Sequence, residues 1–123
     1  HVLDFLEGAR NLPDRETTRK MLYEIIHVRL TDGVVLVDSK QGSMRGIMAA
    51  TQEYFQGENV CFIQLAYISP SESDLCREML TRIRSWAKKL GLNNIIMMTP
   101  RNPKPFTRKY GFTFVSSVMT RRV

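Results

Sequence analysis

One long amphipathic helix between two apolar segments constrains the fold of this chain more than any other feature. Apolar residues recur at helical spacing between residues 73 and 90, and Gly91 follows them as a stop signal. The apolar residues of this stripe are Leu75, Met79, Leu80, Ile83, Trp86, Ala87 and Leu90. NVCFIQLAYI (59–68) precedes the helix and NNIIMMT (93–99) follows it, and both indicate buried strands. A strand, a helix and a strand in this order predict a right-handed crossover between two parallel strands.

The rest of the chain indicates further helices and strands around this unit. SKQGSMR (39–45) is rich in turn residues and predicts a hairpin between two apolar segments, and Gln56-Gly57-Glu58 predicts a second turn. The expected elements outside the unit are helices over 2–10, 14–30 and part of 100–111, and strands over 34–38, 46–55 and 112–120. This order predicts an α/β fold with a sheet of mixed direction.

Chain length and composition indicate one globular domain over residues 1–123. A chain with 43% hydrophobic and 24% charged residues suits one compact unit. No apolar run approaches the roughly 18 residues that span a bilayer, so no membrane partner is expected. Cys61 and Cys76 fit buried reduced thiols, which favours an intracellular, cytoplasmic location. Because His1 and His27 are the only histidines and the cysteines are far apart, no metal site is expected.

The charges of the chain are distributed unevenly. Residues 77–123 contain eleven Lys or Arg and one acid, Glu78, whereas residues 1–76 contain seven basic and eleven acidic residues. Such a distribution is often only a solvated face. It also makes an anionic partner for the C-terminal half plausible, either a protein with an acidic surface or a nucleic acid bound without specificity.

Four stretches of the sequence, in this order, resemble the GNAT superfamily of N-acetyltransferases. They resemble the family's second and third strands, its fourth strand and following turn, its main helix and fifth strand, and its closing segment. The four stretches are 33–50, 65–70, 77–99 and 105–119. The resemblance implies a single three-layer domain, with a mixed central sheet and helices on both faces. It covers nearly the whole chain, and the family's first strand is expected to lie before residue 1.

The resemblance also implies where a CoA pyrophosphate would bind, and this turn departs from the family pattern. Family members carry an R/Q-x-x-G-x-G/A motif, whose glycines and helix N-terminal N–H groups surround the phosphates. Aligned on the apolar pair of the following helix, the Arg or Gln falls at Ser71 and the two glycines at Asp74 and Cys76. Glu72 and Asp74 add two carboxylates, which repel a phosphate. We therefore expect 71–76 to be a structural helix start.

The same alignment defines a set of candidate cofactor-binding residues. The positions that match the family's acyl-CoA site are Tyr67, Ile68, Ser71, Ser73, Asp74, Cys76 and Arg77. A serine hydroxyl can accept a hydrogen bond from a free helical N–H, so Ser71 or Ser73 is expected to cap the helix.

The candidate catalytic residues are few. Many active members of the family carry a tyrosine that protonates the leaving CoA thiolate, and Thr107 occupies that position here. A threonine hydroxyl is a much weaker acid than a phenol. Tyr110 is close in sequence but matches a packed position. Glu53 is a candidate general base with a surface-strand alternative, and Gln64, on the expected central strand, cannot take a proton at neutral pH.

These observations leave three functions open. The first is an active acetyl-CoA-dependent N-acetyltransferase, which works by holding an amine and a thioester together. The second, which we favour, is a protein of the same fold with a degenerate acyl-CoA site, requiring no cofactor and serving in interaction or assembly. By analogy with divergent phage members of the family, it would be a virion component. The third is unspecific nucleic-acid contact through the basic half.

Overall fold

The computed structural model describes residues 15–69, 71–97, 111–112 and 121–122. The described elements are α2 (Arg15–His27), β1 (Gly33–Lys40), β2 (Ser43–Phe55), β3 (Glu58–Ile68), α3 (Ser73–Lys89) and β4 (Ile95–Met97). The helices expected over 2–10 and within 100–111, and most of the strand expected over 112–120, lie outside the described residues.

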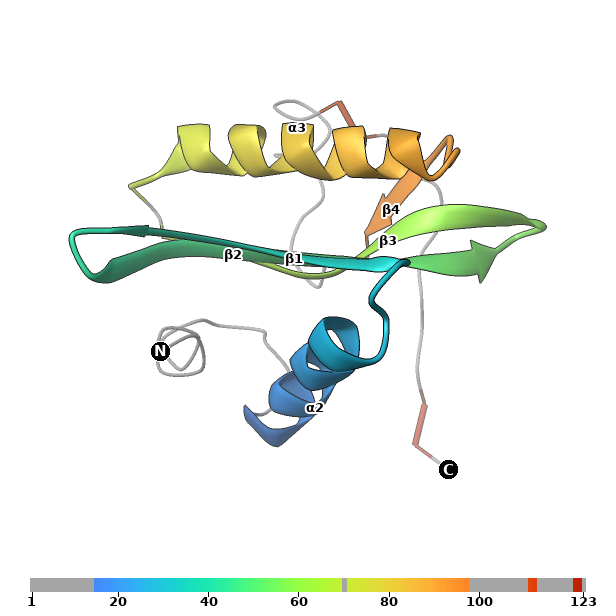
Figure 1. Ribbon diagram of the computed structural model, residues 1–123, viewed down its shortest axis with the longest axis horizontal. Helices are drawn as coiled ribbons and strands as arrows, with labels where there is room; N and C mark the ends of the chain where they lie inside the picture. The colour runs from blue at the N-terminus through green and yellow to red at the C-terminus, as the bar shows by residue number, and fades with distance from the viewer. Residues whose placement is uncertain (1–14, 70, 98–110, 113–120, 123) are drawn as a thin grey trace.

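The sheet has the mixed direction that the sequence predicts. Its four described strands lie in the order β1-β2-β3-β4. β1 pairs with β2 and β2 with β3 in antiparallel fashion, whereas β3 and β4 are parallel. α3 covers one face of the sheet and α2 the other (Figure 1). The three layers and the parallel pairing across α3 are therefore confirmed.

Two tight turns connect the three antiparallel strands. Gln41 and Gly42 have φ angles of 53° and 78°, and Gln56 and Gly57 have φ angles of 49° and 90°. Positive φ at both central residues gives a two-residue turn whose twist matches that of the flanking strands. The prediction that 39–45 forms the first turn was too broad, because the ladder continues to the pair Lys40 and Ser43. The polar residues there reflect exposure to solvent.

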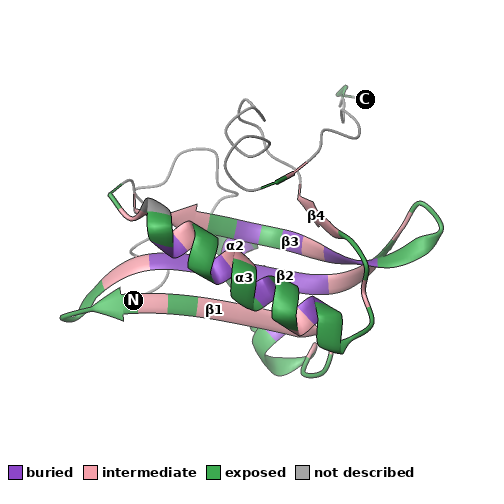
Figure 2. Cartoon of the chain, turned by 90° about the horizontal axis from the view of Figure 1, so that it is seen from above, coloured by how far each residue is buried: buried purple, intermediate pink, exposed green. Residues whose placement is uncertain are grey.

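The larger core lies between α3 and the sheet. Four α3 side chains of the predicted stripe are buried, namely Leu75, Met79, Ile83 and Ala87, and they pack on Met48, Ala50, Cys61 and Ile63. Leu80 and Trp86 are half-buried against this cluster, and Leu90 is exposed (Figure 2). The stripe is therefore correct in its centre and reaches solvent at its edges. After Leu90, Gly91 ends α3 with a φ of 76°, as predicted.

A β-bulge in β3 changes which side chains face each helix. Ala50 pairs with Ile63 and Ala49 with Leu65, so Gln64 is an extra residue without a partner in β2. An extra residue locally interrupts the ladder and increases the twist of the strand. The bulge therefore divides β3 into a segment before Gln64 and a segment after it.

The two segments of β3 contribute to opposite cores. Cys61 and Ile63 pack in the α3 cluster, whereas Leu65 and Tyr67 pack with the α2 cluster. An uninterrupted strand would place all four on one face, because side chains alternate with a period of two. The expectation that 59–68 is covered on both faces is wrong at Gln64 and Ala66, which are exposed. The strand that is buried on both faces is β2, over residues 46–51.

Candidate functional site

The turn between β3 and α3 is held by backbone hydrogen bonds. The Ser69 N–H donates to the Arg45 carbonyl at 2.8 Å, and the Glu72 N–H donates to the Ser69 carbonyl at 2.9 Å. Glu72 is the N-cap residue of α3, and its side chain makes no capping hydrogen bond. The prediction that Ser71 or Ser73 is the capping residue is therefore wrong, because Glu72 occupies the N-cap position and α3 begins at Ser73.

An arginine from β2 binds the carboxylate at this helix start. Arg45 Nη1 lies 3.5 Å from Glu72 Oε2, and Arg45 Nη2 lies 2.5 Å from Asp38 Oδ2. The three side chains are about 30% exposed and come from three different elements. An arginine beside a helix N-terminus is a favourable place for an anion. Here that place is already taken by the protein's own carboxylates.

The start of α3 packs closely on β2. A Cβ on Gly46 would lie 2.7 Å from Ile68 Cδ1 and 3.1 Å from Leu75 Cδ2. A side chain at this position would force Ile68 Cδ1 to shift, so glycine leaves room for the end of β3 and the first turn of α3 to pack on β2 as they do. This close contact fixes the position of the turn relative to the sheet.

The candidate cofactor-binding residues do not share one surface. Tyr67 packs with the α2 cluster, and Ile68 and Cys76 pack with the α3 cluster. Ser71, Asp74 and Arg77 are exposed, and Ser73 is the first residue of α3. Three of the seven positions thus contribute to the cores. The exposed ones lie on the turn and the first turns of the helix.

A second polar cluster surrounds the candidate base Glu53. Arg29 Nη1 donates to Glu53 Oε1 at 2.7 Å, and Thr51 Oγ1 donates to the same oxygen at 3.0 Å. Gln64 Nε2 donates to Thr51 Oγ1 at 3.0 Å. The structure therefore brings Glu53 and Gln64 together through Thr51. The Oε1 atom of Glu53 already accepts two hydrogen bonds and is poorly placed to take a proton from a substrate amine.

Arg29 joins this cluster to the end of α2. Its guanidinium donates to both carboxylate oxygens of Asp32, at 2.9 and 3.0 Å, and to the Gln52 carbonyl at 2.6 Å. These hydrogen bonds to Arg29 lower the pKa of Asp32, and the two carboxylates raise the pKa of Arg29. This role of Arg29 was not predicted from the sequence. Its signal was a charged residue at helical spacing from the apolar residues Leu22 and Ile25, because a partly buried charge needs a partner.

The two candidate polar residues lie at different distances from the turn. Glu53 pairs with Val60, eight residues before Ile68, which corresponds to about 26 Å along a strand. Gln64 lies four residues before Ile68, or about 13 Å. The bulge at Gln64 also follows directly on the last pair between β3 and β4, which is Ile63 with Met97.

Cys61 does not add a reactive group to the described part of the chain. Burial raises the pKa of the Cys61 thiol to about 11, so it stays protonated and is a poor nucleophile at neutral pH. Over the described ranges, no group of three or more acidic, histidine or cysteine side chains is arranged to hold a metal. No helix in the part of the chain that the structure covers is long and apolar enough to cross a membrane. Thr107 and Tyr110 lie outside the described residues.

Solved structures resemble the fold of this chain, although no protein-family model and no curated sequence matches it. An apo aminoglycoside 6'-N-acetyltransferase from Acinetobacter haemolyticus is 14% identical, with 98% of this chain and 88% of that chain covered and a TM-score of 0.77. AAC(6')-Iy in complex with the bisubstrate analogue CoA-S-monomethyl-acetylneamine is 17% identical, with coverages of 98% and 90% and a TM-score of 0.72. A transcriptional regulator from Bacillus halodurans is 15% identical, with coverages of 99% and 91% and a TM-score of 0.76.

These similarities show the fold. The chain has the GNAT fold, with an α/β architecture and a mixed sheet. The expected resemblance is confirmed at this level.

Proposed function

We propose that this chain is a GNAT-fold protein with a degenerate acyl-CoA site, which acts by binding another macromolecule and not by acyl transfer. The observation that carries the proposal is the contact of Arg45 with Glu72 at the N-terminus of α3. In the family pattern this end of the helix receives the pyrophosphate. Here the carboxylate of Glu72 lies at the helix N-terminus and pairs with Arg45.

The charges at this turn oppose a second anion. Glu72 and the exposed Asp74 both lie at the first turn of α3. Two like charges at contact distance repel by about 1 kcal/mol in water and about 4 kcal/mol in a partly desolvated site. A diphosphate would have to displace Glu72 from Arg45 or bind beside it. The side chains at 74 and 76 also occupy space that the glycines of the motif leave open.

The catalytic candidates support the same proposal. Glu53 is committed to Arg29 and Thr51, and it is separated from the turn by most of β3. An amide such as Gln64 can orient a substrate but cannot accept its proton. The candidate base that the described residues bring beside Gln64, through Thr51, therefore already accepts two hydrogen bonds.

A second candidate function is acetyl-CoA-dependent N-acetylation of an amine. One observation favours it. AAC(6')-Iy, which shares the fold, binds a CoA-containing bisubstrate analogue. Positioning alone can accelerate acyl transfer without a general base.

A thermal-shift titration with acetyl-CoA distinguishes the two functions. A ligand at a hundred times its dissociation constant adds about 2.7 kcal/mol to stability. We expect no shift of the wild-type melting temperature up to about 1 mM acetyl-CoA, a concentration at which even weak ligands bind. A clear shift, with acetylation of an amine panel, would establish the enzyme and overturn the proposal.

A matched pair of variants tests the role of the turn. Glu72→Gln removes the carboxylate beside Arg45, and Glu78→Gln removes an exposed carboxylate one turn and a half further along α3. If Glu72 excludes the phosphates, acetyl-CoA or free CoA should bind Glu72→Gln more tightly than both the wild type and Glu78→Gln. The same weak response in all three proteins would mean that the shape of the turn, and not its charge, excludes CoA.

A further inference from the structure

A hollow lies at the C-terminal end of α3, away from the turn around Glu72. It is a groove of about 680 Å³ between the last turns of α3, the start of β4 and the turn that joins β2 and β3. The groove begins near Arg84, eleven residues beyond Ser73, which corresponds to about 17 Å along the helix. It is therefore separate from the turn around Glu72.

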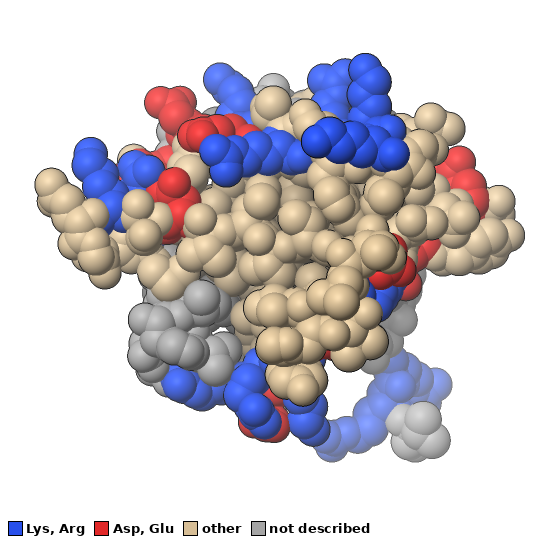
Figure 3. All heavy atoms as spheres, in the orientation of Figure 1, with Lys and Arg blue, Asp and Glu red and all other residues tan. Residues whose placement is uncertain are grey.

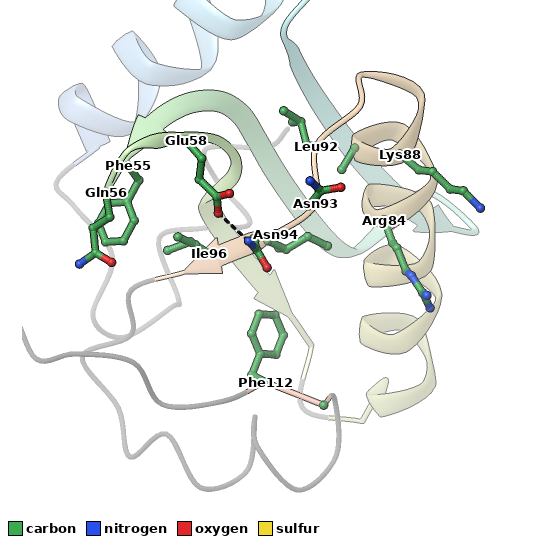
Figure 4. A pocket seen from close by; sticks show the side chains of 13 residues that line it. Phe55, Gln56, Glu58, Arg84, Lys88, Leu92, Asn93, Asn94, Ile96 and Phe112 are labelled. Carbon is green, nitrogen blue, oxygen red and sulfur yellow. Dashed lines mark hydrogen bonds between the residues drawn. The ribbon is translucent and has the colours of Figure 1, made fainter.

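The groove has an apolar floor. The half-buried side chains of Phe55, Ile96 and Phe112 line the hollow, and Leu92 also lines it, from the segment that follows α3 (Figure 4). Apolar side chains that line an open hollow can bury an apolar group of a ligand. Part of any occupant should therefore be apolar.

The α3 wall of the groove is positively charged. Arg84 and Lys88 line this wall, and their charged ends extend outward from the centre of the hollow (Figure 4). Neither has an ion-pair partner among the residues that the structure describes. Arg77, Arg82 and Lys89 are also exposed on α3, and basic side chains gather along this helix in the space-filling view (Figure 3). An occupant that extends out of the groove would meet these cations.

The other polar groups of the groove are mostly neutral. Glu58 carries the only carboxylate among the described lining residues, and it accepts a hydrogen bond from Asn94 Nδ2 at 2.5 Å. Gln56 and Asn93 are exposed at the rim and can pair with a peptide backbone. Amides at the rim, an apolar floor and cations on one wall suit an extended peptide with both apolar and acidic residues.

We propose that this groove binds an acidic segment of a protein partner, with an apolar side chain against Phe55, Ile96 and Phe112 and carboxylates at Arg84 and Lys88. The inference rests on the proposed function, since it names the partner of a protein that acts by binding. A peptide is favoured over a nucleic acid because Phe55 and Phe112 line a hollow instead of an open stacking surface.

The test uses a pool of fluorescein-labelled nonapeptides with each position drawn from Glu, Asp, Leu and Phe. A second pool replaces the acids by Gln and Asn, and a mixed-sequence single-stranded DNA nonamer is the third probe. Binding to the full chain is measured by fluorescence anisotropy. Arg84→Glu with Lys88→Glu is compared with Arg82→Glu with Lys89→Glu, a pair on the same helix outside the groove lining. Lys88 and Lys89 share the last turn of α3, so the effect of their reversal on the end of the helix is matched.

We expect the acidic pool to bind the wild type at least tenfold more tightly than the neutral pool. Reversal of Arg84 and Lys88 should weaken binding at least tenfold, and reversal of Arg82 and Lys89 less than threefold. Equal weakening by both pairs would overturn the proposal that the peptide binds in the groove and would indicate diffuse electrostatic attraction to α3. Tighter binding of the DNA would assign the cations to nucleic acid and overturn the proposal, as would absence of binding by the acidic pool.

A second pair of variants tests the apolar part of the site without changing charge. Asn93→Trp places a bulky side chain at the rim, whereas Asn59→Trp places it on an exposed position of β3 outside the groove. The first should weaken binding of the acidic pool several-fold and the second should not, and equal binding would overturn the groove. The acetyl-CoA titration is independent of these measurements. Acetyl-CoA turnover would therefore contradict the proposed function, whereas the peptide-binding measurements would still test the groove by themselves.

Discussion

The two faces of the sheet are closed by different kinds of contact. Among the described residues, α3 covers its face with a cluster of eight buried side chains. The cluster that α2 forms on the opposite face contains five buried side chains from the same described ranges. Beside this smaller cluster, the end of α2 is joined to β2 by Arg29, which binds Asp32, Glu53 and the Gln52 carbonyl.

The difference indicates which helix is the more firmly attached. Burial of apolar area stabilises α3 whatever the pH and salt concentration, whereas ion pairs weaken when charges are screened or neutralised. α2 also carries exposed apolar side chains, including Tyr23 and Ile26. We therefore expect the attachment of α2, and not that of α3, to respond to solution conditions. Three experiments test this comparison.

The largest effect should come from truncating the same residue type in each cluster. Ile83 is fully buried in the α3 cluster, and Ile25 is 4% exposed in the α2 cluster. Ile83→Ala should lower the free energy of unfolding by about 3–5 kcal/mol and Ile25→Ala by about 2–3 kcal/mol, because a cavity in the larger cluster collapses less easily. Urea unfolding gives both values. A larger loss at Ile25 would contradict the comparison.

The next effect should come from the ion pairs of α2. Arg29→Met leaves Asp32 and Glu53 without their guanidinium and should cost about 1–2 kcal/mol at low salt. Arg19→Met removes an exposed pair with Glu16 and should change stability by about 0.5 kcal/mol or less. Urea unfolding in low and high NaCl provides the measurement. The difference between wild type and Arg29→Met should shrink at high salt, and a constant difference would show that Arg29 acts through packing.

The smallest effect should be an acid-dependent one at Asp32. Hydrogen bonds from Arg29 lower the pKa of Asp32 in the folded protein, while an unfolded aspartate takes up its proton near pH 4. The stabilisation is therefore complete above about pH 4 and is lost as the pH falls through the lower folded pKa. Asp32→Asn should reduce the fall in melting temperature between about pH 5 and about pH 2, two values on either side of the ordinary aspartate pKa.

Much of the fold follows from local patterns in the sequence. The apolar stripe of α3 and the two apolar segments around it predicted the parallel pair β3 and β4, and both are present. The two halves of the first hairpin were also predicted, although the turn was placed too broadly. These features depend on side chains a few residues apart, so periodicity alone reveals them.

The candidate site was less predictable. The mismatch of Ser71, Asp74 and Cys76 with the glycine-rich motif was visible in the sequence. The contact of Glu72 with Arg45 was not, because it joins α3 to a distant strand. The pairing of Glu53 with Arg29, across 24 residues, likewise changed the role of the candidate base.

The sequence by itself determined the order of the described helices and strands, the face of α3 that is buried and the asymmetry of charge, since these are properties of composition and periodicity. The tertiary structure alone decided the bulge at Gln64, the partners of Arg29 and Arg45 and the groove beyond Arg84. The physical reason is that register and charge pairing depend on distances between segments remote in the chain. Such distances are fixed only when both faces of the sheet are packed.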